Sequence, residues 1–166
     1  MRRASALFLL LVAAAPAAHA NEASQALGAR ALIALHGGKT QEGLALLDSA
    51  IAADPSDVDA LAQRGATRAQ QGDYPGAIVD LRAALAINPN LPPVALELGV
   101  ALTETGDYRE AEPWLMRAQQ QPDLEAQASF FLGLTQLRLD RLDDAQRNFE
   151  RARAGDASLA LSTEYY

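Results

Sequence analysis

The sequence predicts an all-α solenoid of four helix pairs, because one pattern recurs every 34 residues. Two sets of glycines keep this step: Gly65, Gly99 and Gly133, and Gly38, Gly72 and Gly106. One large apolar position runs through all four copies, as Leu47, Leu81, Leu115 and Phe149. A fixed period of this length is typical of stacked helical repeats, in which each unit buries its apolar side against its neighbour.

The first 20 residues differ from the periodic region. Two arginines are followed by an apolar run over residues 6–15, and the small residues Ala18 and Ala20 come after it. This layout predicts a cleaved signal peptide over residues 1–20, an exported protein and a mature chain that begins at Asn21. The alternative is an uncleaved anchor, but the run is about half the roughly 20 residues that cross a bilayer. We therefore expect no stable membrane insertion.

Composition excludes several classes of protein. Without the two arginines of the signal peptide the formal charge changes from −7 to −9, so we expect no binding of nucleic acid, which needs a basic surface. The chain has no cysteine, which excludes disulfides, thiolate metal sites and a lipid-modified cysteine at the mature N-terminus. The remaining length predicts one soluble domain of ordinary size over residues 21–159.

The period divides this domain into four units, residues 24–57, 58–91, 92–125 and 126–159. The second unit has the clearest pattern: Leu61, Gly65, Ala77, Leu81, Ala84 and Pro89. A period of 34 differs from that of ankyrin units, which have 33 residues, and from the 40 or more of HEAT units. The chain resembles the tetratricopeptide repeat (TPR) family over about residues 24–159. This resemblance implies a right-handed α-solenoid of four helix-turn-helix repeats.

The recurring residues also have physical tasks. A glycine inside a helix costs about 1 kcal/mol relative to alanine, so we expect Gly65 and its equivalents to allow close contact between helices. Gly72 and Gly106 fall between the two helices of a unit, where left-handed backbone ends the first helix. Asp73 and Asp107 follow directly, and we expect their side chains to cap the second helix.

The units depart from the family pattern at several positions. The usual tyrosine position holds a different residue in each unit, which predicts an under-filled core: Ala34, Arg68, Leu102 and Gln136. Asp140 replaces the turn glycine, and Pro113 and Pro122 interrupt the regular pattern. We therefore expect the third and fourth units to be less regular than the first two.

Candidate catalytic residues are scarce. His36 is the one histidine of the mature chain and falls near a helix end, where a capping or surface role is the simplest interpretation. The acidic pairs Asp57–Asp59 and Asp143–Asp144 fall at helix starts, where negative charge is favourable. The sequence thus predicts no enzyme, no metal site and no cofactor.

The resemblance also implies where a partner binds, because in the family the first helix of each unit lines the concave side. The corresponding apolar and basic residues form the candidate groove: Leu32, Leu35, Leu96, Val100, Phe130, Leu134, Leu137 and Arg138. An apolar stripe suits a peptide or protein segment with apolar anchors. The same side chains could instead pack the repeat core, and packing is the favoured interpretation for Phe131.

We therefore predict a non-catalytic protein–protein interaction scaffold in a bacterial cell envelope, most simply in the periplasm, with secretion as an alternative. Its expected role is the assembly or export of an envelope complex. A holdase-like chaperone with a broad client range is the alternative function.

The last seven residues, 160–166, are expected to start a capping helix or a truncated fifth repeat. A helix that short cannot cover the fourth unit. The sequence therefore predicts a partly exposed face around Leu142 and Phe149, which is covered either by further repeats of a longer protein or by self-association through this C-terminal face.

Overall fold

The computed structural model describes residues 21–156, which form eight helices and no strand. The first described helix covers residues 21–36. Seven more follow: α2 (Thr40–Ala53), α3 (Val58–Gln70), α4 (Tyr74–Ile87), α5 (Pro92–Thr105), α6 (Tyr108–Ala118), α7 (Glu125–Arg138) and α8 (Leu142–Gly155). The predicted signal peptide and the predicted start of a fifth repeat lie outside the described residues.

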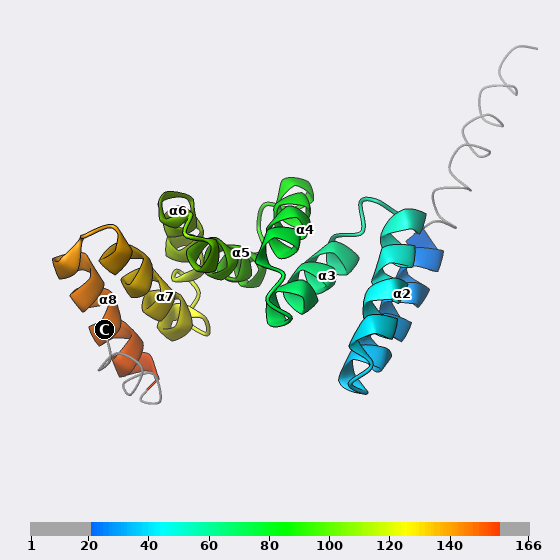
Figure 1. The fold of residues 1–166 in the computed structure, drawn as a ribbon, viewed down its shortest axis with the longest axis horizontal. Coiled ribbons are helices and arrows are strands. Elements are labelled where there is room, and N and C mark those ends of the chain that lie inside the picture. Colours follow the sequence, from blue (N-terminus) through cyan, green and yellow to red (C-terminus); the bar gives the residue numbers. More distant parts are fainter. Residues whose placement is uncertain (1–20, 157–166) are drawn as a thin grey trace, which may run out of the picture.

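The helices pack as consecutive antiparallel pairs and form a curved row (Figure 1). The most extensive contacts are within pairs, between α3 and α4, α5 and α6, and α7 and α8. Contacts between neighbouring pairs, such as α4 with α5 and α6 with α7, are the next most extensive. The all-α solenoid predicted from the 34-residue period is confirmed.

Each pair is joined by a turn in left-handed backbone conformation. Gly38, Gly72 and Gly106 have φ angles of 73°, 80° and 87°. Asp140 takes the same place in the fourth unit with a φ of 60°, the one positive φ of a non-glycine residue between 21 and 156. The turn glycines therefore have the predicted role, and aspartate adopts the same conformation at some cost in strain.

The predicted caps are confirmed in part. The Asp73 carboxylate accepts a hydrogen bond from the backbone N–H of Gly76 at 3.0 Å and caps α4. The prediction for Asp107 was wrong, because its side chain makes no capping hydrogen bond to α6. Its Oδ2 instead accepts a hydrogen bond from the Thr105 hydroxyl at 3.2 Å.

The glycines inside the first helices allow the close contact that was expected of them. A Cβ atom at Gly65 would lie 2.8 Å from the Leu81 side chain, and one at Gly99 would lie 2.6 Å from Leu115. At Gly133 the contact would be with Phe149, also at 2.6 Å. The recurring glycine and the recurring large apolar residue are therefore one packing unit, used in three successive repeats.

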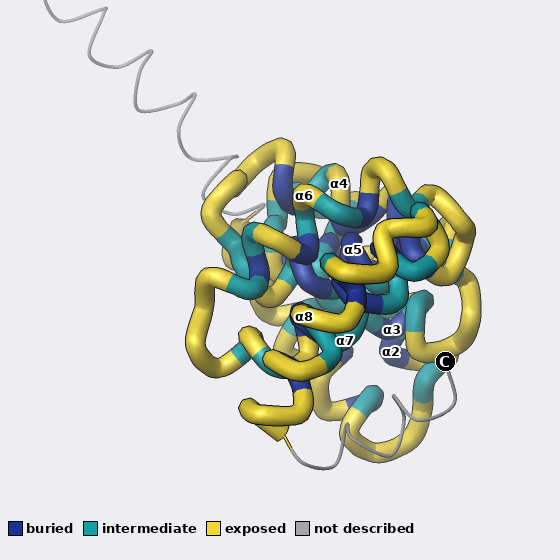
Figure 2. Tube along the Cα trace, turned by 90° about the vertical axis from the view of Figure 1, so that its left-hand side faces the viewer, coloured by how far each residue is buried: buried dark blue, intermediate teal, exposed yellow. Residues whose placement is uncertain are grey.

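The apolar core has two parts, and buried segments run through the middle of the array in Figure 2. The larger part extends from α4 to α7 and includes Leu81, Leu98, Leu102, Leu115 and Leu132. The smaller part belongs mainly to the first unit and consists of Ala31, Leu47, Ala50 and Ala60. Contacts between α2 and α3 are correspondingly fewer than those between α4 and α5.

A buried ion cluster joins α2, α3 and α4, where the two parts of the core adjoin. Asp80 is 1% exposed and accepts from Arg64 Nε at 2.9 Å and from the same guanidinium's NH2 at 2.6 Å. Arg68 donates a third bond to this carboxylate at 2.8 Å. Arg64 also reaches Asp48 at 2.7 Å. Three charge-assisted hydrogen bonds compensate for the burial of the Asp80 charge. The hydrogen bond between Arg64 and Asp80 also raises the pKa of Arg64.

These partners explain how the family's tyrosine position is filled. If each unit is numbered from its first residue, position 11 bonds to position 23 on the second helix in two units, Arg68 to Asp80 and Gln136 to Asn148. In the third unit these positions hold Leu102 and Trp114, which both belong to or pack against the larger core. The Asn148 amide donates to the Gln136 side-chain oxygen at 2.8 Å. The expected under-filling is therefore wrong for the second and fourth units, where a polar pair occupies the space.

Candidate binding surface

Curvature of the array places the first helices of the repeats on its inner side. Consecutive first helices contact each other, α3 with α5 and α5 with α7. Within residues 21–156 the second helices α2, α4, α6 and α8 make no comparable contacts with one another. Elements that are closer together lie on the inside of a curved row, so the surface of the first helices is concave.

Two of the predicted groove residues pack the repeats instead of lining the surface. Leu96 is 5% exposed and belongs to the larger core. Leu35 is partly buried against the smaller core, and its side chain fills the space next to Gly43 on α2. Phe131 also packs against the larger core, as expected.

Four apolar residues at position 9 of the repeats form a row across the concave surface: Leu32, Ala66, Val100 and Leu134. None of the four is fully buried: Leu32 is 36% exposed, and Val100 packs in part against the larger core. Phe130 lies beside this row on α7, partly buried, with its ring 5.4 Å from that of Phe131. We call Leu32, Ala66, Val100 and Leu134 the apolar row.

The N-terminal end of the apolar row opens into a cleft of about 410 Å³ between the helix over residues 21–36 and α3. Leu32 and Leu47 supply apolar walls, and Asp59 and Gln63 supply polar ones. The cleft exists because small residues face it; a Cβ at Gly28 would meet nothing within 4 Å. Its size suits one or two side chains of a partner.

Position 6, one helical turn before the apolar row, carries polar groups in two successive units. The side-chain oxygen of Gln63 on α3 is buried and has no hydrogen-bond partner among residues 21–156. Glu97 on α5 is partly buried, and this burial raises the pKa of its carboxyl group. Neither residue stood out in the sequence, although Glu97 is one of only two charged residues in the apolar helix α5.

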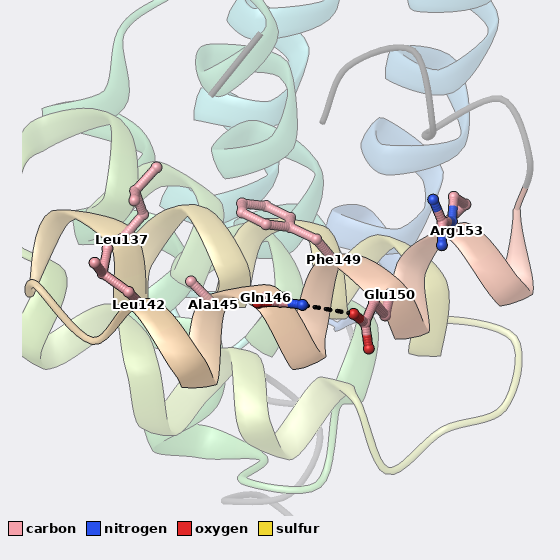
Figure 3. A pocket seen from close by; sticks show the side chains of 7 residues that line it. All are labelled: Leu137, Leu142, Ala145, Gln146, Phe149, Glu150 and Arg153. Atoms are coloured by element: carbon pink, nitrogen blue, oxygen red, sulfur yellow. Dashed lines mark hydrogen bonds between the residues drawn. The ribbon is translucent and has the colours of Figure 1, made fainter. Parts of the chain in front are cut away.

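A second cleft, of about 350 Å³, lies at the C-terminal end of the array, on the last two helices α7 and α8 (Figure 3). Leu137 comes from α7, and Leu142, Phe149, Glu150 and Arg153 come from α8. Leu142 is 59% exposed and Phe149 is partly buried. Leu137 therefore lies at this C-terminal cleft, while Arg138 is exposed at the end of α7.

The acidic candidates lie at helix starts, and the histidine lies at a helix end. Asp57 caps α3, since its carboxylate accepts from the backbone N–H of Ala60 at 2.9 Å, and Asp143 and Asp144 lie in the first turn of α8. His36 is exposed at the end of the first described helix. Residues 21–156 contain no group of three metal-binding side chains, and none of their helices is long and apolar enough to cross a membrane.

Family models identify the repeats directly. Two models of the tetratricopeptide repeat match, one over residues 29–92 and the other over residues 68–130. Together with the fold, these matches show that the chain belongs to the tetratricopeptide repeat family. Members of this fold class serve as scaffolds for protein–protein interaction. Among curated protein sequences, none gives a significant match to the chain.

Solved structures with the same fold support this assignment. MamA from Desulfovibrio magneticus RS-1 superposes with a TM-score of 0.75 and is 23% identical, covering 81% of this chain and 76% of MamA. YrrB, a TPR protein with an unusual peptide-binding site, gives 0.73 and 22%, covering 79% and 68%. PilF from Pseudomonas aeruginosa gives 0.70 and 27%, covering 84% of this chain and 64% of PilF.

Proposed function

We propose that this protein is a non-catalytic scaffold of the bacterial cell envelope that binds an extended or helical protein segment on its concave surface. The binding would serve the assembly or export of an envelope complex. The envelope location rests on the predicted signal peptide over residues 1–20 and on the absence of cysteine from the sequence.

The apolar row is the observation that carries the proposal. Val100 and Leu134 are held on the two neighbouring first helices α5 and α7, and the cleft beside Leu32 adds room for an anchor side chain. Apolar side chains that stay partly exposed in a concave surface gain free energy when a partner covers them, about 25 cal/mol per Å². The peptide-binding site of YrrB gives a precedent for such a role in a protein of this fold.

A charge placed in the apolar row tests the proposal. Random dodecapeptides displayed on phage would be selected on the purified chain, and the affinity of an enriched peptide measured for the parent protein and for Leu134→Glu. We expect the substitution to abolish binding while the melting temperature stays nearly unchanged. Val79→Glu is the matched control, because Val79 is 65% exposed on the outer helix α4.

Two results would contradict the proposal. A loss of stability of about 2–5 kcal/mol in Leu134→Glu would identify Leu134 as a core residue. Enrichment of peptides without any shared pattern, together with suppressed aggregation of unrelated unfolded proteins, would favour the holdase-like chaperone.

We also propose that the C-terminal cleft mediates self-association. The two ends of α8 differ in charge: Asp143 and Asp144 lie in its first turn, where Asp144 already pairs with Arg141 and Arg147, and Arg153 lies in its last turn. Two copies of α8 packed antiparallel would therefore place opposite charges together around Leu142 and Phe149, as a symmetric dimer requires. Light scattering should give a dimer that Leu142→Glu converts to a monomer; a monomeric parent protein at high concentration would contradict this proposal.

A further inference from the structure

Glu97, in the first helix of the third unit, is a partly buried carboxylate that has no ionic partner among residues 21–156. It lies in α5, which packs against α3, α4, α6 and α7, yet no described residue of these helices donates a hydrogen bond to it or forms an ion pair with it. Burial alone raises its pKa. Asp80, which is fully buried, has two arginine partners, and the partly buried Glu112 pairs with Arg141, so other buried carboxylates of the repeats do have partners.

The repeat register places Glu97 next to the apolar row. Glu97 is three residues before Val100, so the two side chains are neighbours on one face of α5. Gln63 occupies the same register position on α3, which contacts α5, and its amide oxygen also has no partner within residues 21–156. Two acceptors without donors thus lie one helical turn from the apolar row, at the register position that Phe131 fills in the fourth unit.

We propose that the partner segment carries a cationic side chain, lysine or arginine, that pairs with Glu97 while its apolar neighbours cover Val100 and Leu134. This inference rests on the proposed concave binding surface and specifies the chemistry of the segment. A bound cation supplies donors to the carboxylate and to the Gln63 amide, and it replaces the water that burial has removed.

The charges of the surface agree with a cationic partner. Asp59 lines the N-terminal cleft, and Glu104 lies two turns after Glu97 and is exposed. The two arginines of α3, Arg64 and Arg68, are already bound to Asp80. The middle of the concave surface therefore presents acceptors to a ligand rather than free guanidinium groups, and like charges near Glu97 disfavour an acidic segment.

The same peptide selection tests this inference when it is run in parallel on the parent protein and on Glu97→Gln. From the parent protein we expect peptides that combine apolar residues with lysine or arginine one to three positions away. From Glu97→Gln we expect the apolar residues to remain and the basic preference to disappear. For one enriched peptide, Glu97→Gln should weaken binding about tenfold or more, as expected for the loss of a hydrogen-bonded charge.

Two controls separate local pairing from a general effect of charge. Glu104→Gln removes a charge from the same helix, α5, but from an exposed side chain, so it should change affinity less than about threefold. Replacing the basic residue of the peptide with norleucine should weaken binding to the parent protein and have little further effect on Glu97→Gln. Such non-additivity identifies a direct interaction.

The possible failures are distinguishable. If the parent protein enriches apolar peptides without basic residues, or if Glu97→Gln retains the basic preference, the pairing is refuted while the concave binding surface stands. Equal losses in Glu97→Gln and Glu104→Gln would also refute a specific pair. If no peptide is enriched at all, the proposed function itself fails.

Discussion

Removal of the Asp80 carboxylate should be the most damaging single change in the second repeat. Asp80 is 1% exposed and accepts three hydrogen bonds from Arg64 and Arg68, whose side chains are 16% and 28% exposed. Asp80→Ala removes three hydrogen bonds at once, and it leaves Arg64 with only the exposed Asp48 and Arg68 with only Asp73, at 3.9 Å. Breaking a buried ion pair in this way costs about 3–5 kcal/mol, which in a domain of this size corresponds to roughly 10–20 °C in melting temperature.

The neighbouring repeat supplies a rescue. The positions of Arg64, Arg68 and Asp80 are occupied in the third unit by Leu98, Leu102 and Trp114. The triple variant Arg64→Leu, Arg68→Leu and Asp80→Trp should recover most of the loss and match the parent protein to within about 1–2 kcal/mol, because well-packed apolar groups can replace a buried ion pair without net cost.

Urea and thermal unfolding, followed by far-UV circular dichroism, would measure these changes. Arg82→Ala is the control: Arg82 pairs with Glu110, but both side chains are nearly half exposed, so its loss should cost less than about 1 kcal/mol. A cost below about 1 kcal/mol for Asp80→Ala would refute the importance of the cluster. A triple variant as unstable as Asp80→Ala would refute the interchange of paired positions between repeats.

Four further substitutions test the burial of Glu97, the helix contacts and the turns. Burial raises the pKa of Glu97, so its ionised form destabilises the fold. Glu97→Gln should therefore have a higher melting temperature than the parent protein at pH 7. This difference in melting temperature should shrink as the pH falls and vanish below the ordinary glutamate pKa of about 4.3. An equal shift at every pH would show a packing effect. Gly99→Ala places a Cβ atom against the Leu115 side chain and should lower the free energy of unfolding by about 1–3 kcal/mol. At Gly28 a Cβ atom has no neighbour within 4 Å, so Gly28→Ala should raise the free energy of unfolding by up to about 1 kcal/mol, as measured in urea. Asp140→Gly removes a non-glycine residue from a positive φ, so the free energy of unfolding should rise by up to about 1 kcal/mol, with a slightly higher melting temperature. A clear loss of stability would mean that the aspartate side chain stabilises the turn.

The fold could be predicted from the sequence because the information is periodic. Each glycine that fits under Leu81, Leu115 or Phe149 recurs with its partner at one spacing, so the pattern identifies the helices and their contacts together. The left-handed turns follow from glycine in the same way. The contacts of a periodic position can be predicted from the repeat pattern alone, because each repeat provides the same neighbouring residue.

The ion cluster and the binding surface were harder to predict, because they depend on differences between repeats. Arg68 alone suggested a poorly filled core, and only its pairing with Asp80 on the second helix shows how the space is used. Leu96 and Val100 look equivalent in sequence, four residues apart on one helix. Whether each is buried depends on the neighbouring helices, which bury Leu96 in the core and cover Val100 only in part.

The concave binding surface can be tested most directly by photo-crosslinking with the selected peptide. A photoreactive phenylalanine analogue would replace Val100 on the concave side in one variant and Val79 on the outer side in another, and mass spectrometry would measure the yield of crosslinked peptide. We predict efficient crosslinking from position 100, competed by excess unlabelled peptide, and only background from position 79. Equal yields from both positions, or a higher yield from position 79, would contradict binding on the concave surface.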